Sequence, residues 1–388
     1  MNSKPVNVLF ISHSGLWGGA QKSLLALVNY IDNKKIYKPH FIFGSKGDFL
    51  DFISNRGYKT FNIILLRWSA YNFGLKNILW FFYNFLFGTF FICRVIKKNK
   101  IRIVHTNTIF NFQGAIAAKI MNVKHIWHIR EDLSLPYFKF LIPYKSIVKI
   151  INILSDKIIC ISEIEKRLFK NSKKIKVVYN TWQINPNTIH NKTNYNKNAD
   201  IDKVLFGQFG FIFPNKNQKW CVESFIELCK EKDNCELVII GKIVDQDYYN
   251  KLMDLIIDSG IEDKIKFIPF TDDVASWYKK IDVLLNPMLR GIVGRVTIEA
   301  MSFGIPCIGN SGDIDQSLFR NDVNGFLVDF NDKEAMKNSM LKLTNPTLRS
   351  KFGDASFKKS NEALSNSIYG GSVSDIYMNL LSNSYYHD

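Results

Sequence analysis

The most informative part of the chain, residues 290–309, reads Arg-Gly-Ile-Val-Gly-Arg-Val-Thr-Ile-Glu-Ala-Met-Ser-Phe-Gly-Ile-Pro-Cys-Ile-Gly. It predicts a polar, glycine-bearing loop, then a short helix from Gly294, then an apolar strand after Pro306. A helix N-terminus presents backbone N–H groups at the positive end of its dipole, where a phosphate can bind. Glu299 follows within the helix, and its carboxylate can accept hydrogen bonds from ribose hydroxyls. The alternative is an amphipathic helix with a solvated Glu before a buried strand.

Strand and helix patterns alternate on both sides of a polar stretch rich in Asn, Lys and Thr. Repeated β-α units of this kind predict two doubly wound, Rossmann-like α/β domains. The expected division is an N-terminal domain over 1–184, a linker over 185–203, a C-terminal domain over 204–370 and a C-terminal helix over 371–388 that returns to the N-terminal domain. Ligands of parallel sheets bind at the carboxyl ends of the strands, so two such sheets facing each other form a cleft.

Composition excludes several classes of protein. The 388 residues suffice for two hydrophobic cores. The six cysteines are scattered in apolar runs without a Cys-x-x-Cys pair, which predicts reduced, buried thiols and no disulfide framework. The histidine spacing matches no zinc pattern. Residues 1–6 are polar and run into a strand, so no signal peptide is expected.

The net charge of +16 is concentrated in the first half of the chain. Residues 1–200 hold 30 Lys and Arg against 9 Asp and Glu, whereas residues 201–388 hold 21 against 26. An anionic partner is therefore expected for the first half only, either nucleic acid or a phospholipid surface. The aromatic-basic pattern of an RNA-binding sheet is missing, so no nucleic-acid partner is expected.

Residues 78–96 form a nearly continuous apolar, aromatic-rich run followed by Arg94, Lys97, Lys98 and Lys100. Their length approaches that of a membrane span. However, the run lies between two strand candidates, so we expect a helix that packs partly on its own domain and partly enters the headgroup region of a membrane. The alternative is an ordinary core helix of an α/β domain.

Three further segments follow strand candidates. Residues 13–21 read His-Ser-Gly-Leu-Trp-Gly-Gly-Ala-Gln, in which Gly18 and Gly19 permit close approach of a diphosphate or sugar at a helix start, or simply form a tight turn. His128 and Arg130 end a strand and can present a hydrogen-bond donor and a cation, although a lone His is more often structural. Lys216 can reach a diphosphate as a point charge.

The 294–306 segment resembles the donor-nucleotide segment of family 4 glycosyltransferases, retaining enzymes with the GT-B fold. The usual form there is Glu-x-Phe-Gly-x-x-x-x-Glu-Ala-Met-Ala-x-Gly-x-Pro-Val. The chain matches it at Gly294, Glu299, Ala300, Met301, Gly304 and Pro306. Two positions depart from the pattern, because the first Glu falls on Gly291 and the Phe on Val293.

The resemblance extends to other segments over roughly residues 5–382. The motif Gly19-Ala20-Gln21 matches a Gly-Ala-Glu/Gln loop over the donor, and His128 matches a histidine that contacts the transferred sugar. Lys216 matches a lysine of Gly-Arg-x-x-x-x-Lys-Gly, whose arginine falls on Phe211; Arg295 or Arg290 is expected to substitute for it. The remaining matches are Asn107 in an acceptor-side segment, Asn180 in a structural turn, and Asp315 in place of a Glu.

The resemblance therefore implies a set of site residues. The catalytic residues expected are His128, Lys216 and Glu299. Donor binding is expected from Gly18, Gly19, Gly210, Lys216, Arg290, Gly294, Arg295, Val296, Thr297 and Glu299. The acceptor side is expected to use Gln21, Asn107 and Arg130. No metal and no cofactor are expected, since the nucleotide-sugar is a co-substrate.

The expected function is retaining transfer of a sugar from a nucleotide-diphospho-sugar, a UDP-sugar ahead of a GDP-sugar. The expected acceptor is a membrane-presented glycan or glycolipid in the biosynthesis of capsule, O-antigen or lipopolysaccharide. An anionic membrane surface is the expected partner, with the protein cytoplasmic and peripheral on the inner face of the cytoplasmic membrane. Two alternatives are a nucleotide-sugar epimerase and a non-catalytic GT-B subunit that stabilises a partner enzyme.

Overall fold

The structure is a computed structural model that describes residues 4–67, 75–131, 142–169, 172–182, 203–288, 294–312 and 317–382, without the side chains of residues 75–78. The chain divides into two compact units. Unit 1 consists of residues 1–181 and 366–388, and unit 2 consists of residues 182–365. Of the linker expected at 185–203, only Lys203 lies among the described residues.

Unit 1 is built on a parallel 7-stranded sheet with the order β3-β2-β1-β4-β5-β6-β7. Neighbouring strands align in register, for example Phe10 with Phe41 and with His105. The strands are β1 (Val6–Ser12), β2 (Tyr37–Phe43), β3 (Lys59–Asn62), β4 (Ile103–Asn107), β5 (Lys124–Ile129), β6 (Lys157–Cys160) and β7 (Ile175–Val177).

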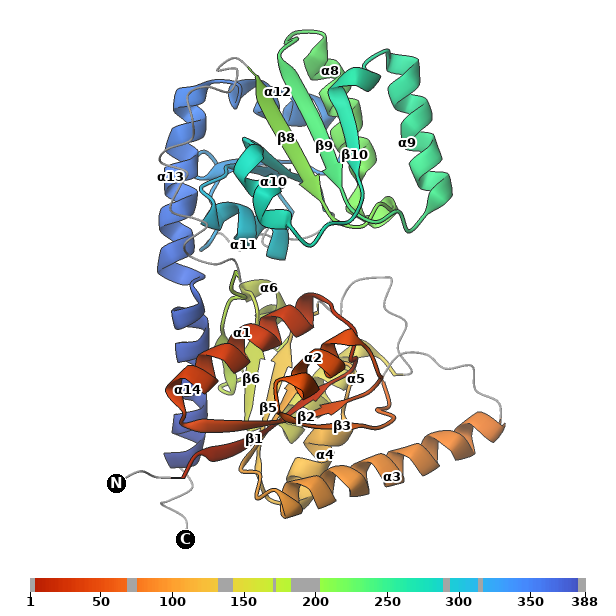
Figure 1. Cartoon of the computed structure of the whole chain (residues 1–388), viewed down its shortest axis with the longest axis vertical. Coiled ribbons are helices and arrows are strands. Elements are labelled where there is room, and N and C mark those ends of the chain that lie inside the picture. The colour runs from red at the N-terminus through yellow and green to blue at the C-terminus, as the bar shows by residue number, and fades with distance from the viewer. Residues whose placement is uncertain are drawn as a thin grey trace. The chain divides into compact units, whose positions relative to one another are not determined.

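Helices cover both faces of this sheet (Figure 1). One apolar layer joins the sheet to α1, α2 and α14, and α14 packs along α1. The other layer joins the sheet to α3, α4 and α5. The helices of unit 1 are α1 (Gly19–Lys34), α2 (Asp48–Asn55), α3 (Leu75–Lys98), α4 (Gln113–Ile120), α5 (Tyr144–Leu154), α6 (Glu163–Arg167) and α14 (Asn366–Ser382).

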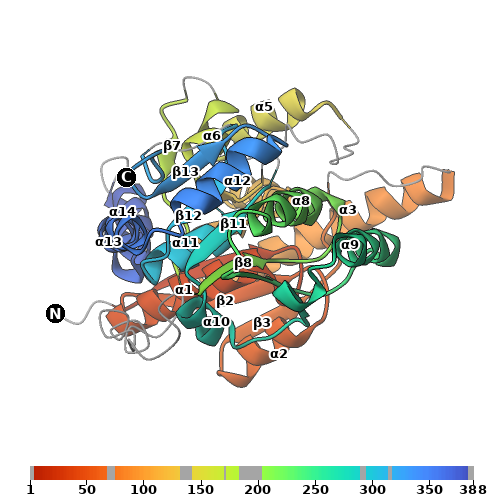
Figure 2. The ribbon, with the colours of Figure 1, turned by 90° about the horizontal axis from the view of Figure 1, so that it is seen from above.

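Unit 2 repeats the architecture on a parallel 6-stranded sheet with the order β10-β9-β8-β11-β12-β13. Helices α8 and α12 lie side by side on one face, as Figures 1 and 2 show, and α10 and α11 pack on the other. The strands are β8 (Val204–Phe209), β9 (Cys235–Ile240), β10 (Ile265–Ile268), β11 (Val283–Asn286), β12 (Cys307–Asn310) and β13 (Gly325–Val328). The helices are η1 (Pro214–Lys216), α8 (Gln218–Cys229), α9 (Gln246–Ser259), η2 (Glu262–Lys264), α10 (Val274–Lys280), α11 (Arg295–Ser302), α12 (Lys333–Lys342) and α13 (Pro346–Ala363).

Each sheet has a point at which the strand order reverses direction. In unit 1 this point lies between β1 and β4, and in unit 2 between β8 and β11. Doubly wound sheets bind ligands outside the carboxyl ends of the strands at such a point. The topology therefore predicts that ligands bind near the residues after Ser12 and Asn107 in unit 1, and after Phe209 and Asn286 in unit 2.

Helix α3 contains the apolar run at residues 78–96. By length and composition Leu79–Lys98 could cross a membrane, and 33% of that stretch is buried. Ile92, Val95 and Ile96 pack into the core, whereas the outer face carries exposed apolar side chains from residue 79 to residue 90. The alternative of an ordinary core helix therefore holds only for the inner face and the C-terminal third of α3.

Candidate functional site

The carboxyl edge of the unit 2 sheet brings two glycines into close approach. Gly210 follows β8 with a φ of +135°, in the region that favours glycine. A Cβ on Gly241, which follows β9, would lie 1.9 Å from the carbonyl oxygen of Gly210. Side chains are therefore excluded here, and the loop that leads to Lys216 runs close to the strand ends.

Lys216 lies at this edge of the sheet, and the partner of its ammonium group is the uncharged thioether sulfur of Met288. Its ammonium group donates to Met288 Sδ at 3.3 Å, and its backbone carbonyl accepts from Gln208 Nε2 at 3.0 Å. Burial lowers the pKa of Lys216. Among the described residues no carboxylate pairs with Lys216, and an anionic ligand would supply the charge that Met288 cannot.

Glu299 is held by two neighbours. Its Oε2 accepts from the hydroxyl of Tyr278 at 3.0 Å, and its Oε1 accepts from Arg295 at 2.6 Å, one helical turn away. Burial and the adjacent Glu299 carboxylate raise the pKa of Tyr278 far above its usual value, so its hydroxyl stays a donor. Arg295 was expected to contact a diphosphate. To do so, its guanidinium would have to give up or share its ion pair with Glu299.

The helix N-terminus at α11 follows the sequence prediction in position. Gly294 is the N-cap residue in extended conformation, without a side-chain cap. Val296 is half-buried, and the side chain of Thr297 is fully buried, with its hydroxyl accepting from Asn286 at 2.9 Å. Only the backbone of Thr297 therefore suits the expected donor contact. Arg290 lies outside the described residues, as do Gly291, Val293 and Asp315.

In unit 1, the loop after β1 leads into α1 through Gly18, an N-cap residue in extended conformation, and Gly19, the first helical residue. Gln21 turns back under this loop. Its amide donates to Ser12 Oγ at 3.2 Å and to the carbonyl of Ser14 at 3.3 Å. Because Gln21 is buried, its side chain shapes the loop, and the expected acceptor-side contact would fall to the loop itself.

Arg130 connects four elements of unit 1 through its guanidinium. It donates to Asn107 Oδ1 at the end of β4 and to Asn180 Oδ1 after β7, both at 2.7 Å. It also donates to the hydroxyl of Tyr369 on α14 at 3.0 Å, and reaches His128 Nδ1 at 3.4 Å. Asn107 is itself buried and donates to the carbonyl of Ala20 at 3.2 Å. The structure thus brings Asn107 together with His128 and Arg130, which the sequence analysis had placed in a different segment.

His128 is fully buried, contrary to the expectation that it ends its strand rather than facing a core. Its Nδ1 lies 3.2 Å from His105 Nε2, and His105 Nδ1 lies 2.7 Å from the hydroxyl of Tyr377. Burial, Arg130 and the neighbouring imidazole hold the pKa of His128 well below its usual value, so the ring is neutral. Arg130 only donates, which makes Nδ1 an acceptor and places the proton on Nε2. That Nε2 has no hydrogen-bond partner among the described residues.

Sequence reasoning missed three residues beside this network. Glu131 accepts from the backbone N–H of Ile109 at 3.0 Å, and burial raises its pKa to about 7. Thr108 has a φ of +111°, strained for a β-branched residue, and its hydroxyl lies 3.2 Å from His13 Nδ1. Burial and Arg67 lower the pKa of His13 to about 4. Their positions directly after β5, β4 and β1 were the available signal.

Within the described ranges, no group of three or more His, Cys, Asp or Glu side chains is placed to hold a metal ion.

Comparison with known proteins agrees with this architecture. The family model described as Glycosyl transferases group 1 matches residues 191–359. A curated protein of Haemophilus influenzae described as an uncharacterized glycosyltransferase is 29% identical over 203 residues, which cover 52% of this chain and 55% of that protein. The UDP-Gal:alpha-D-GlcNAc-diphosphoundecaprenol alpha-1,3-galactosyltransferase of Escherichia coli is 25% identical over 276 residues, covering 65% of this chain and 68% of that enzyme.

Among solved structures, Anabaena HepE in complex with UDP aligns with a TM-score of 0.77 at 18% identity, covering 96% of this chain and 100% of that one. The two doubly wound units and this likeness establish the GT-B fold. Over residues 191–359 the chain is similar to glycosyltransferases of group 1. The matched segment spans about half the length of the Haemophilus relative.

Proposed function

We propose that the protein transfers a sugar from a UDP-sugar, with retention at the anomeric carbon, to a membrane-presented glycan or glycolipid in surface-polysaccharide biosynthesis. The observation that carries this proposal is the carboxyl edge of unit 2. There the N-terminus of α11, the carboxylate of Glu299 and the cation of Lys216 belong to adjoining loops and helices of one sheet edge. Retention rests on the resemblance to family 4 enzymes, whose donor segment the chain matches around Glu299.

Each group has a distinct role in the proposed reaction. Glu299 accepts hydrogen bonds from the ribose of the nucleotide. Lys216 and the N-terminus of α11 neutralise charge on the diphosphate as it leaves, because preorganised donors and cations act most strongly where charge develops. We propose that these groups do so without a metal ion. The buried Nε2–H of His128 donates to the transferred sugar, and Arg130 fixes the ring through Nδ1.

The printed names of the relatives support the choice of donor and acceptor. The Escherichia coli enzyme uses a UDP-sugar and a diphosphoundecaprenol-linked acceptor, and the Anabaena structure contains UDP. An acceptor on such a lipid requires the protein to work at the inner face of the cytoplasmic membrane. The charge of the first half of the chain and the exposed face of α3 are consistent with that location.

A non-catalytic role is the second candidate, and one observation favours it. Phe211, which stands where the resembled family has an arginine, is 50% exposed at the same sheet edge as Lys216. An apolar side chain cannot neutralise a leaving diphosphate. We nevertheless favour catalysis, since Lys216 has no carboxylate partner among the described residues and keeps its cation for the ligand.

A product assay tests the proposal. The protein is incubated with UDP- and GDP-sugars and a polyprenyl-diphosphate-linked acceptor, and the anomeric configuration of the product is determined by NMR. We expect a UDP-sugar to give a product with the configuration of the donor. Lys216→Met should lower kcat/KM by tens to hundreds of fold, whereas Lys219→Met, an exposed lysine three residues on, should not.

The same assay separates the alternatives. UDP binding without transfer to any acceptor would identify a non-catalytic subunit. Conversion of the sugar nucleotide itself without an acceptor would identify an epimerase.

A further inference from the structure

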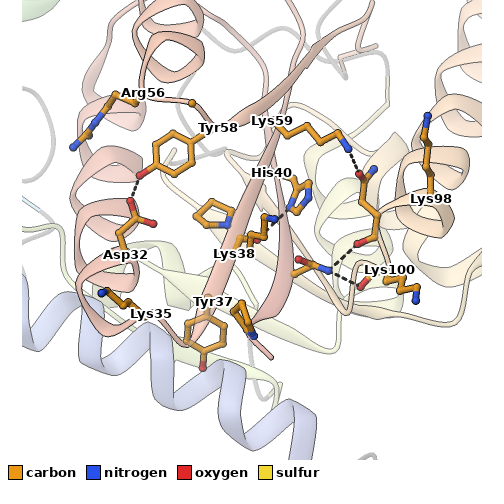
Figure 3. Close-up of a pocket in the computed structure, with 15 residues that line it drawn as sticks. Asp32, Lys35, Tyr37, Lys38, His40, Arg56, Tyr58, Lys59, Lys98 and Lys100 are labelled. Atoms are coloured by element: carbon orange, nitrogen blue, oxygen red, sulfur yellow. Dashed lines mark hydrogen bonds between the residues drawn. The ribbon is translucent and has the colours of Figure 1, made fainter. Parts of the chain in front are cut away.

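Six basic side chains line a hollow of about 840 Å³ at the amino ends of the unit 1 strands, the end of the sheet opposite to Asn107, His128 and Arg130. Figure 3 shows the residues that line it. The six basic side chains come from the end of α1, the start of β2, the turn before β3 and the end of α3. The six are Lys35, Lys38, Arg56, Lys59, Lys98 and Lys100. Since β1 runs from this edge to the other over seven residues, the hollow lies roughly 20 Å from the carboxyl ends of the strands.

The positive charge of this hollow is largely uncompensated. None of the six cations makes an ion pair with a described residue, and Asp32 is the one acidic residue among those that line the hollow. The carboxylate of Asp32 accepts the hydroxyl of Tyr58, and Figure 3 shows this bond at one side. Like charges gathered around one concavity repel each other, so an anion bound there would relieve an unfavourable arrangement.

Neutral groups position Lys59. Lys59 donates to Asn99 Oδ1 at 2.7 Å, and Asn7 in turn donates to the carbonyl of Asn99 at 2.8 Å. His40 is buried beside them. Burial together with Lys59 and Lys38 lowers its pKa, so it adds no charge of its own at neutral pH. The hollow therefore combines a neutral floor with a cationic rim.

Helix α3 links this rim to an apolar surface. Its exposed residues form a stripe at helical spacing: Leu79, Phe82, Tyr83, Leu86, Phe87 and Phe90. Lys98 follows Phe87 by eleven residues, close to three helical turns, so the two side chains leave α3 in nearly the same direction. A phospholipid has both a phosphate for the basic hollow and acyl chains for the apolar stripe. A soluble phosphate compound has only the phosphate.

We propose that the basic hollow binds the phosphate of an anionic membrane lipid and thereby fixes how unit 1 sits on the bilayer. The site is separate from the donor and acceptor residues, and its position on the sheet excludes it from the transfer chemistry. It rests on the membrane location given above but not on the transfer reaction itself.

Vesicle sedimentation tests the site without sugar nucleotide or acceptor, so a failure of the transfer reaction would leave this result intact. The probe is phosphatidylcholine vesicles with and without phosphatidylglycerol. The double variant Lys38→Gln/Lys98→Gln removes two exposed cations of the hollow. The matched control Lys173→Gln/Lys176→Gln removes two exposed cations beside β7, the opposite edge strand of the sheet.

We expect the hollow variant to bind anionic vesicles about 30-fold more weakly than wild type, since each cation near such lipid contributes about fivefold. The control should lose less than about threefold. Both variants should retain the thermal stability of wild type, because the changed side chains are exposed. Equal losses in the two variants would mean that diffuse charge binds the membrane, and would overturn the assignment.

A second measurement separates lipid from soluble phosphate. Inorganic pyrophosphate is titrated into wild type and the hollow variant in a calorimeter. Pyrophosphate binding that the variant loses, combined with unchanged vesicle binding, would assign the hollow to a soluble phosphate compound and contradict the lipid.

Discussion

At the scale of single residues, Glu299 shows how neighbouring side chains orient the carboxylate proposed to contact ribose. Tyr278 and Arg295 each donate to one carboxylate oxygen, so the group is oriented before any ribose arrives. Each carboxylate oxygen has two acceptor positions, so ribose hydroxyls can join the existing partners without displacing them. Hydrogen bonds that a carboxylate accepts are stronger than those to a neutral acceptor, which suits the proposed contact with ribose.

Glu299→Gln is expected to weaken UDP binding by about 1.5–3 kcal/mol, the usual contribution of hydrogen bonds to a charged group. The substitution keeps the size of the side chain and an acceptor for Tyr278, but its NH2 group replaces the oxygen that accepts from Arg295, so the melting temperature should fall as well. Calorimetric titration with UDP measures the effect, with the exposed Glu227→Gln on α8 as control. An unchanged dissociation constant would remove Glu299 from the donor site.

The sequence singled out residues that lie together in the structure, but it did not predict their surroundings. His128, Arg130 and Asn107 were singled out, and the structure joins them in one network. The partner that orders His105 in this network is Tyr377, 272 positions away, and no local pattern connects them. The left-handed backbone of Thr108 was equally hidden, because a β-branched residue gives no reason to expect it.

At the scale of elements, the two faces of the unit 1 sheet are covered by helices of different character. Helix α14 packs closely against α1 at Gly370. A Cβ on Gly370 would lie 2.1 Å from Cγ of Tyr30 on α1, so this contact leaves no room for a larger side chain. Helix α3 leaves an aromatic face exposed. The sequence of residues 78–96 is apolar on nearly every side, so periodicity could not separate its inner from its outer face.

Gly370→Ala is expected to destabilise the protein by about 1–3 kcal/mol, because the new methyl group forces α14 away from α1. The neighbouring Gly371→Ala is the matched control. Its Cβ would meet Tyr30 at 3.5 Å, an ordinary contact, and alanine favours a helix over glycine. Chemical denaturation measures both, and equal stability of the two variants would mean that the helices do not pack at Gly370.

The exposed face of α3 is expected to bind membrane through its aromatic side chains. Phe82 is 58% and Phe87 51% exposed, whereas Phe85 points inward and stacks on Phe112. The double variant Phe82→Ser/Phe87→Ser should fold normally and lose at least about tenfold in binding to anionic vesicles, because burial of a Phe contributes about 1.5–3 kcal/mol. Phe85→Ser should instead lower the melting temperature. Wild-type vesicle binding by the double variant would exclude this face from the membrane contact.

At the scale of the whole molecule, the fold class followed from alternation alone. Repeated apolar strands and amphipathic helices predicted two parallel sheets, and the two observed strand orders are those of doubly wound units. The return of a C-terminal helix to the N-terminal domain was expected, but its pairing with α1 was not, because α14 follows the whole of unit 2 in sequence and meets α1 only through tertiary contacts. The basic hollow was hidden for the same reason, since its cations come from four separate segments.

Acid is expected to unfold the protein through its buried imidazoles. Burial is the main cause that lowers the pKa of His13, His40, His105, His125 and His128, with His13 at about 4 and His125 at about 3. Between these values and the ordinary 6.5, the unfolded chain binds protons that the folded chain does not. The free energy of unfolding therefore decreases as the pH is lowered, by about 1.4 kcal/mol per pH unit for each such histidine.

Glu131 acts in the opposite direction and supplies the matched control for this prediction. Its folded pKa of about 7 lies above the ordinary 4.5, so between those values the folded chain binds the extra proton and gains stability as pH falls. The histidines outnumber it, and we expect the melting temperature to drop steadily below pH 6.5, the ordinary value for histidine. Glu131→Gln removes the opposing contribution, so its free energy of unfolding should fall more steeply than that of wild type as the pH drops from 7 to 4.5, by about 1.4 kcal/mol more per pH unit. A melting temperature that is level from pH 6.5 to pH 4 would mean that these imidazoles are hydrated or protonated in the folded protein.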